Sequence, residues 1–211
     1  LTTLATCVTE PVAYGATPCG MLELDADGYL YCPKIIVGSV SIFPPNYVDS
    51  SSPELARSWG NFWEYFSFPS GVAVDDTRGR VYIAASLVAD GGGNYMPVGR
   101  VQIWDRVNRT NNISYAWYGL ANPPGEFYRP SYVSLPSGQR FNWPADVAVD
   151  DTRGILYVSE SQAHRIAKFD VNEATPVFIG FMGSECTEQG QFRFPQGIEV
   201  DAQGNFYVVD S

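Results

Sequence analysis

The chain repeats one short pattern four times, and this repeat limits the possible folds more than any other feature. Each copy begins at a proline, continues through alternating apolar residues to an aspartate, and passes a glycine before a second apolar run that contains a tyrosine. The copies start at Pro18, Pro69, Pro144 and Pro195 and read PCGMLELDADGYLYC, PSGVAVDDTRGRVYIA, PADVAVDDTRGILYVS and PQGIEVDAQGNFYVVD. Self-similarity of this kind indicates a solenoid, a propeller or another array of similar units.

The third copy predicts a set of short antiparallel strands. Residues 145–149 alternate between small or polar and apolar side chains, as expected for a half-buried strand. In the turn that follows, Asp150 can accept hydrogen bonds from backbone amides and Gly154 can adopt a positive φ. Residues 155–159, 165–170 and 175–181 are predicted to form three more strands. Four antiparallel strands in a unit of about 50 residues are typical of a β-propeller blade.

Three further segments resemble the NHL-repeat family. The junction at 190–198 reads GQFRFPQGI, and the third strands read RIAKFD at 165–170 and RVQIWD at 100–105. The resemblance extends over 18–211 and implies an all-β fold, a β-propeller of four-stranded antiparallel blades. About four blades are represented, as part of a larger ring within one propeller domain. Alternatively, strands near the N-terminus complete the fourth blade and close a four-bladed ring. The predicted units are N-terminal strands at 1–17, blades at 18–68, 69–143 and 144–194, and the first half of a further blade at 195–211.

The second unit is longer than its neighbours. Its first proline lies 75 residues before the next one, whereas the other two spacings are 51 residues. Residues 86–98, which include three consecutive glycines, are predicted to lengthen the loop between the second and third strands. Residues 122–140 are predicted to lengthen the exit from this unit, after a fourth strand that ends at Tyr118 and Gly119. Insertions in repeat proteins map to loops on one face, often the binding face.

Composition excludes some classes of partner. With 211 residues, 45% of them hydrophobic, the chain can bury a sizeable core as one domain. Thirteen Lys and Arg against 23 Asp and Glu give a net charge of −10, which disfavours binding to nucleic acid. No apolar run approaches the roughly 20 residues that a membrane-spanning helix needs. We therefore expect neither a nucleic-acid partner nor a membrane span.

Glycosylation sequons and cysteines predict an extracellular protein. Asn108 and Asn112 begin two sequons in one polar loop, so both are predicted to carry glycans. The chain begins at Leu1 with no basic or apolar leader, as expected for a processed or partial chain. Cys19 and Cys32 flank one predicted hairpin and are expected to form a disulfide. Free buried thiols are the alternative, and three connectivities are open if all four cysteines are bridged.

Some propellers that this chain resembles are enzymes that depend on a metal ion. The resemblance therefore raises the question of whether this chain contains suitable metal ligands. A peptide-amidating lyase needs several histidines, and this chain has one, His164, in a predicted turn. A lactonase places acidic residues around a central calcium ion. The aspartate that recurs in every copy is better explained by the turn, which leaves Asp146, Glu160 and Asp210 as positions to test for calcium. We predict no catalytic, metal-binding or cofactor-binding residue; the alternative is a metal-dependent lyase or lactonase with ligands partly outside this chain.

Binding of another macromolecule is the remaining class of function. Trp, Tyr and Arg dominate the energetics of protein interfaces. Tyr128 and Tyr132 lie in the predicted 122–140 insertion and are the candidate interface residues. The sequence thus predicts an extracellular propeller that binds proteins or glycans, or that forms a structural part of a larger extracellular assembly, without catalysis.

Overall fold

The structure is a computed structural model that describes residues 19–35, 39–45, 57–59, 67–89, 95–96, 99–106, 131–137, 139–185 and 189–211. Several predicted features lie outside these ranges: the N-terminal strands at 1–17, the sequons at Asn108 and Asn112, the strand ending at Tyr118 and Gly119, and Tyr128. Cys7 and Cys186 also lie outside them.

The described chain is all-β, with one short 3-10 helix, and its strands form antiparallel sheets that follow one another along the sequence. Blade 1 contains β1 (Glu23–Leu24), β2 (Leu30–Lys34), β3 (Ser39–Phe43) and β4 (Arg57–Trp59). Blade 2 contains β5 (Ser67–Asp75), β6 (Arg80–Ala89), β8 (Arg100–Asp105) and β9 (Ser131–Val133), and β7 (Tyr95–Met96) pairs with β6. Blade 3 contains β10 (Pro144–Asp150), β11 (Ile155–Glu160), β12 (Arg165–Asp170) and β13 (Val177–Met182). Blade 4 is the two-stranded sheet of β14 (Ile198–Val200) and β15 (Phe206–Val208).

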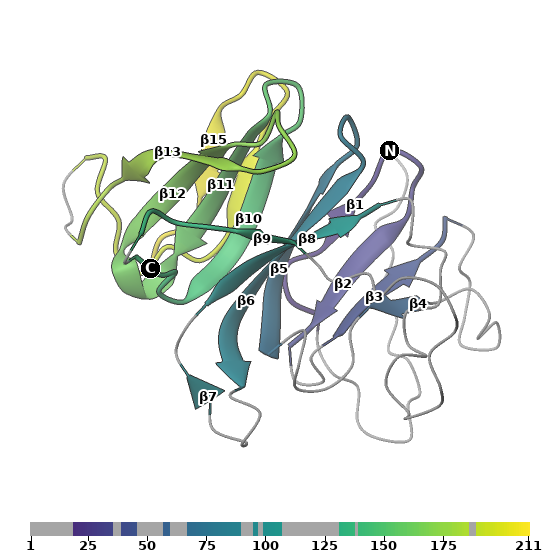
Figure 1. Cartoon of the computed structure of the whole chain (residues 1–211), viewed down its shortest axis with the longest axis horizontal. Coiled ribbons are helices and arrows are strands. Elements are labelled where there is room, and N and C mark those ends of the chain that lie inside the picture. Colours follow the sequence, from purple (N-terminus) through teal and green to yellow (C-terminus); the bar gives the residue numbers. More distant parts are fainter. Residues whose placement is uncertain are drawn as a thin grey trace.

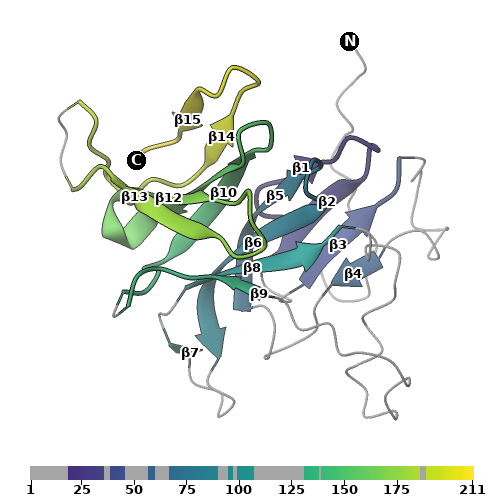
Figure 2. The same ribbon diagram turned by 45° about the horizontal axis from the view of Figure 1, so that its top comes forward.

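The sheets form a row in chain order from blade 1 to blade 4 (Figures 1 and 2), and the row curves so that Met21 of blade 1 approaches Gly197 of blade 4. Each sheet begins at its first strand and proceeds outward in sequence order, which is the arrangement of propeller blades. The fold predicted from the fourfold repeat, an all-β array of four-stranded antiparallel blades, is therefore confirmed. Among the described residues, no helix is long and apolar enough to cross a membrane.

The same register recurs in all four blades and gives each blade two different faces. Tyr31, Tyr82, Tyr157 and Tyr207 lie opposite Glu23, Ala73, Ala148 and Glu199 on the preceding strand. We call the face that carries this tyrosine the trailing face. Successive side chains of a strand point to opposite sides. The residues that flank these positions therefore form the other face, the leading face, which in blade 3 includes Val147, Val149 and Leu156.

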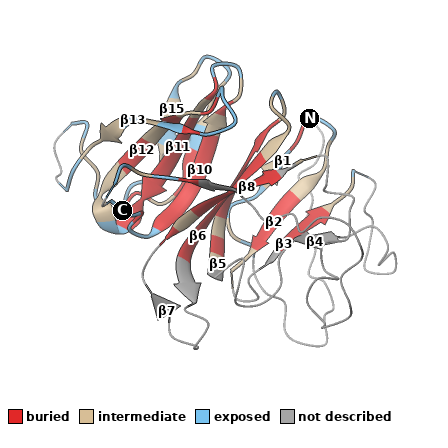
Figure 3. Cartoon of the chain, in the orientation of Figure 1, coloured by how far each residue is buried: buried red, intermediate tan, exposed pale blue. Residues whose placement is uncertain are grey.

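Blades pack by placing a trailing face against the leading face of the next blade. Tyr31 of blade 1 packs in one cluster with Val72, Val74 and Val81 of blade 2. Tyr82 of blade 2 packs with Val147 and Leu156 of blade 3. Tyr157 packs with Ile198, Val200 and Phe206 of blade 4, and its ring stacks on Phe206 at 5.2 Å between centroids. Buried residues accordingly concentrate in the strands of blades 2 and 3, whereas β13 carries intermediate and exposed residues (Figure 3).

The predicted insertions in blade 2 contain strands. Residues 86–98 were expected to be a lengthened loop, but β6 continues to Ala89 and pairs with β7, with Val88 opposite Met96. The three consecutive apolar residues at 87–89, LVA, continue the strand beyond the blade. In the range expected to be an exit loop, β9 at Ser131–Val133 pairs with β8 and is the fourth strand of the blade 2 sheet. The choice of an outer strand depends on tertiary pairing, which local sequence signals do not specify.

Candidate functional site

The recurring aspartates organise the turns, as the sequence predicts. Oδ1 of Asp25 accepts hydrogen bonds from the amides of Asp27 and Tyr29, at 3.0 and 2.9 Å. Oδ1 of Asp201 accepts from Gln203 and Asn205 in the same way, at 3.0 and 2.8 Å. These bonds satisfy backbone groups that the tight turn leaves without partners. The aspartates are therefore structural parts of each blade.

The second carboxylate oxygen distinguishes two kinds of turn. In the four-residue turns of blades 1 and 4, it accepts a hydrogen bond from the tyrosine of the second strand, Tyr31 or Tyr207, at 3.0 Å in each case. In the longer DDTRG turns of blades 2 and 3, an arginine takes that place. Arg78 contacts Oδ2 of Asp75 at 3.2 Å, and Arg153 contacts Oδ2 of Asp150 at 2.7 Å.

These arginines also join neighbouring blades. Arg78 donates to the carbonyl oxygen of Asp151 in blade 3, and Arg153 donates to that of Gln203 in blade 4, both at 2.8 Å. At the junction between blades 1 and 2, Arg106 approaches Asp27 at 2.8 Å and Asp76 at 2.9 Å. The basic side chains of the turns thus form a series of bridges between blades. They do not gather into the basic surface that RNA binding requires.

Asp146 replaces the glycine of the equivalent positions in the other blades and lies near the inner edge of the array. It is 4% exposed, and its Oδ2 accepts a hydrogen bond from the amide of Ile198 in blade 4, at 3.0 Å. Its Oδ1 has no hydrogen-bond partner among the described residues. This atom faces Gly71 of blade 2, where a Cβ atom would clash with the carboxylate. Asp146 therefore connects blade 3 to blade 4 and requires the glycine in blade 2.

Carboxylates from all four blades influence one another in this region. Burial, and then the charge of Glu199, raise the pKa of Asp146 to about 7, although amide hydrogen bonds oppose the shift. Burial, followed by the charges of Glu199, Asp146 and Asp76, raises the pKa of Glu23 to about 8. Both groups consequently hold a proton more firmly in the folded protein than in an unfolded chain.

The acidic positions that the sequence singles out for calcium have protein partners. Glu160 is fully buried and accepts hydrogen bonds from Arg165 at 2.7 Å and from the amide of Asn142 at 2.8 Å. Asp210 accepts from the amide of Arg193 at 2.7 Å. Within the described part of the chain, no group of three or more His, Cys, Asp or Glu side chains is placed to hold a metal ion.

The single histidine also links two blades. Nδ1 of His164 accepts a hydrogen bond from the amide of Phe194 at 3.1 Å, and the two rings meet edge to face with centroids 4.4 Å apart. Phe194 has a positive φ of 56°, and Phe68 and Trp143, which also precede the first proline of a repeat, have a φ of 57°. L-residues seldom adopt this conformation. Its recurrence before three prolines is a feature of the repeat that sequence reasoning did not predict.

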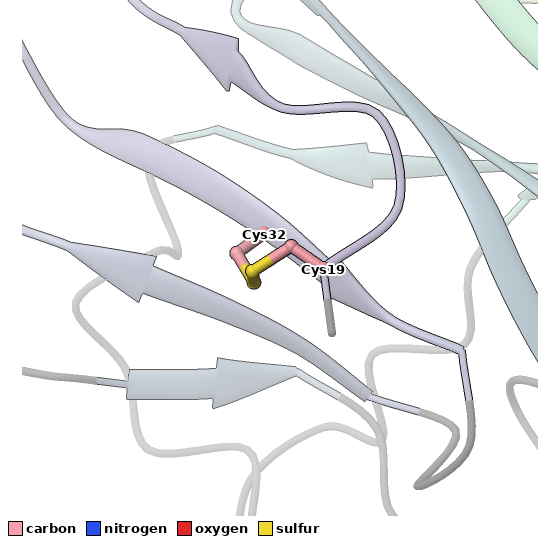
Figure 4. Close-up of a disulfide and its surroundings, with 2 residues drawn as sticks. All are labelled: Cys19 and Cys32. Atoms are coloured by element: carbon pink, nitrogen blue, oxygen red, sulfur yellow. A yellow bond between two sulfur atoms is a disulfide. The ribbon is translucent and has the colours of Figure 1, made fainter. Parts of the chain in front are cut away.

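Two other predicted positions are described. Cys19 and Cys32 form a disulfide, with their Cα atoms 5.3 Å apart, between the start of blade 1 and β2 (Figure 4). Tyr132 lies in β9 opposite Gln102 of β8, so it belongs to the outer strand of blade 2.

The end blades expose apolar residues that the middle blades bury. On the trailing face of blade 4, Tyr207 is 60% and Val209 63% exposed, whereas Tyr157, equivalent to Tyr207, is 5% exposed. On the leading face of blade 1, Leu22 is 52% and Leu24 61% exposed. These two surfaces, on the first and last blades described, are exposed apolar positions that sequence reasoning missed. A comparison of equivalent positions could have found them only if the packing order of the blades had been known.

Comparison with known proteins identifies the repeat. A family model described as NHL repeat matches residues 141–169, which extend from just before β10 almost to the end of β12. The match supports an NHL-repeat family assignment. No curated protein matches it. NHL repeats commonly mediate protein interactions, so the match indicates a propeller-type interaction module.

Proposed function

We propose that this NHL-repeat protein is an extracellular module that binds other proteins or glycans, or that forms part of a larger assembly, and that it has no catalytic activity. One observation carries the proposal. The charged and polar residues that recur in the repeat are engaged in turns and in bridges between blades, whereas the apolar residues at the two ends are exposed. Exposed apolar surface on a folded protein marks a site of interaction.

Two features support the extracellular location. Disulfides persist in oxidising compartments, and Cys19 and Cys32 form one at the start of blade 1. The paired sequons at Asn108 and Asn112 provide acceptors for glycans that are added in the secretory pathway. These features are independent of the fold, and both point to the same compartment.

Expression in secreting eukaryotic cells, with a secretory leader fused before Leu1, tests whether the chain suits the extracellular location. We expect the chain in the medium, with a mass that falls on treatment with an N-glycosidase. The Asn108→Gln and Asn112→Gln variants should each remove one glycan. A chain that remains inside the cell with both asparagines unmodified would contradict the extracellular part of the proposal.

Purification from the native source tests the binding role. We expect the protein to co-purify with a partner or within a larger assembly. A monodisperse single chain with no bound partner would count against the proposal. Tyr128 and Tyr132 are the first residues to replace once a partner is in hand, because they remain the interface candidates indicated by the sequence.

A metal-dependent propeller enzyme is the alternative, and one observation favours it. Oδ1 of Asp146 is buried without a hydrogen-bond partner, beside a glycine and among carboxylates from other blades. A bound cation would satisfy such an oxygen. Metal analysis of the purified protein separates the two functions: stoichiometric calcium or zinc whose loss, for example in Asp146→Asn, also abolishes an enzymatic activity would favour the enzyme and contradict the non-catalytic binding module.

A further inference from the structure

Trp143 lies directly before the first strand of blade 3, at the position that Phe194 occupies before blade 4. Both residues have a positive φ and precede the first proline of a repeat. The ring of Phe194 meets that of His164, with centroids 4.4 Å apart, and Phe194 is partly buried. Trp143 is 38% exposed. Within the described part of the chain, its ring contacts no other aromatic ring and its indole N–H donates no hydrogen bond.

The sequence of blade 2 explains why the ring of Trp143 is open. Gly99 in blade 2 is equivalent to His164 in blade 3, because each comes directly before the arginine that begins a third strand. Gly99 has no side chain that could cover the ring of the next blade. A larger residue would not fit there, because its Cβ atom would clash with the Cδ atom of Pro144. The exposure of Trp143 is therefore a property of the junction between blades 2 and 3.

Hydrogen bonds hold the backbone around this ring in place. The carbonyl oxygen of Trp143 accepts from the amide of Ser161 at 3.0 Å. The amide of Asn142 donates to Glu160, which is fully buried and paired with Arg165 at 2.7 Å. Since L-residues rarely adopt the positive φ of Trp143, the fixed backbone sets the direction in which its side chain leaves the chain. A platform formed in advance reduces the entropic cost of binding a ligand.

The exposed side chains beside this ring are polar. Asn142 directly precedes Trp143, and Gln162 follows Ser161, whose amide bonds Trp143; both side chains are exposed. The other exposed large apolar residues of the described chain lie in blade 1, in β13 and in blade 4. Trp143 is thus a single aromatic ring among polar groups, whereas the centre of a protein interface is a contiguous apolar patch that excludes water.

We propose that Trp143 is the stacking platform of a binding site for a neutral glycan, with Asn142 and Gln162 as hydrogen-bonding residues beside it. A pyranose ring presents C–H bonds that can stack on an indole, and its edge carries hydroxyl groups. Amide side chains both donate and accept hydrogen bonds, as hydroxyl groups do, and the indole N–H is a further donor. The net charge of −10 disfavours acidic glycans. This inference names the class of ligand for the proposed binding role and rests on that role.

Saturation-transfer NMR of the purified full chain with neutral oligosaccharides tests the proposal, with glucose, galactose, mannose or N-acetylglucosamine as the terminal sugar. We expect at least one of them to bind, with a dissociation constant on the order of 100 μM, as suits one sugar on one aromatic platform. Titration calorimetry with that oligosaccharide then compares variants. Trp143→Ala should weaken binding at least about tenfold, whereas Trp143→Tyr keeps a flat ring and should weaken it about threefold or less.

Variants on a second element and on a distant blade complete the design. Asn142→Ala and Gln162→Ala should each weaken binding about three- to tenfold, because each removes one hydrogen-bonding side chain and leaves the ring. Tyr207→Ala removes an exposed aromatic ring from blade 4 and should bind like the wild type. Circular dichroism and thermal unfolding show whether each variant is folded. Gln162→Ala keeps the proposal falsifiable if Trp143→Ala does not fold.

Three results would overturn the proposal: no response from any of these oligosaccharides, binding that Trp143→Ala leaves unchanged, or an equal loss of binding in Tyr207→Ala. A protein partner that Trp143→Ala fails to bind, in a chain that binds no oligosaccharide, would assign this site to protein recognition and would also overturn it. Co-purification with a partner would still support the proposed function after any of these results. Failure of the glycan site is therefore distinguishable from failure of the binding role.

Discussion

Blades 2 and 3, in the middle of the row, share one repeat with blades 1 and 4, at its ends, but the two pairs differ in how the tyrosine and the turn are packed. Blades 2 and 3 have alanine opposite the tyrosine and a long turn whose arginine reaches the next blade. Blades 1 and 4 have glutamate at that position and a short turn in which the tyrosine bonds its own aspartate. The repeat therefore determines the strands and the register of each blade. The burial of the tyrosine and the hydrogen bonds between blades depend on the position of the blade in the row.

The largest expected effect concerns one tyrosine in two environments. Tyr157→Ala removes a ring that is 5% exposed and stacked on Phe206, so we expect a loss of about 3–5 kcal/mol in the free energy of unfolding. Tyr207→Ala removes the equivalent ring at 60% exposure and should cost about 1 kcal/mol or less. Urea unfolding measures both. Equal losses would contradict the difference in burial between the trailing faces of blades 3 and 4.

The turn arginines provide the next comparison. Arg78 is 13% exposed and faces an Asp75 side chain with no exposure, whereas Arg153 is 51% exposed beside Asp150. Arg78→Ala leaves a buried carboxylate without its charge partner, and we expect it to cost about 2–3 kcal/mol. Arg153→Ala should cost less, because water replaces the exposed guanidinium. Thermal unfolding of the two variants tests the order, and a larger loss for Arg153→Ala would reverse it.

The sequence predicted the parts of the fold that depend on local signals. Alternation of apolar residues and the Asp and Gly of each turn lie within about 20 residues, so the strands and hairpins of every blade could be predicted. The Cys19–Cys32 pair follows from the same hairpin. The bridge from Arg78 to Asp151 could not be predicted, because the partner lies 73 residues away and contacts it only through blade packing.

Position in the row explains the other limits of sequence reasoning. β9 lies within a range that was expected to be a loop, because the choice of an outer strand is made by pairing with β8. Tyr207 looks the same as Tyr157 in the sequence, and only the packing order shows that one is covered and the other exposed. The exposed apolar positions therefore become visible only after the blades have been placed.

The raised pKa of Glu23 predicts that the stability of the protein depends on pH. The pKa of Glu23 is raised from 4.5 to about 8, so the folded chain binds a proton that the unfolded chain releases at lower pH. Stability is therefore highest below about pH 4.5 with respect to this group, and it declines as the pH rises toward 8. Glu23→Gln removes that decline and should stabilise the protein by about 1–2 kcal/mol at pH 8, less than a full shift would give because Glu23 is partly exposed.

Denaturant unfolding at pH 5, 6.5 and 8 measures this effect. Glu199→Gln is a second test, since it removes a charge that raises the pKa of both Glu23 and Asp146 and should therefore weaken the pH dependence in part. Asp146, with a pKa raised to about 7, continues to titrate in both variants, so part of the pH dependence should remain. An unchanged slope between pH 5 and 8 in Glu23→Gln would contradict the burial of its carboxylate.

The smallest expected difference concerns the tyrosine hydroxyls. In blade 1, the hydroxyl of Tyr31 donates to Asp25 at 3.0 Å in a buried environment, so Tyr31→Phe should cost about 1 kcal/mol. In blade 2, Arg78 occupies Asp75, and the buried hydroxyl of Tyr82 has no hydrogen-bond partner among the described residues. Tyr82→Phe should therefore be neutral or slightly stabilising, because phenylalanine keeps the ring and removes an unsatisfied polar atom.

Tyr207→Phe completes the series, because its hydroxyl bonds Asp201 at 3.0 Å in an exposed turn and should be worth only a few tenths of a kcal/mol. The expected order of loss is Tyr31→Phe, then Tyr207→Phe, then Tyr82→Phe, measured by urea unfolding at pH 7. This order depends on two properties at once: the turn type decides whether the aspartate accepts from tyrosine or arginine, and the position in the row decides whether water competes. A larger loss for Tyr82→Phe than for Tyr31→Phe would mean that the arginine does not replace the tyrosine in the long turns.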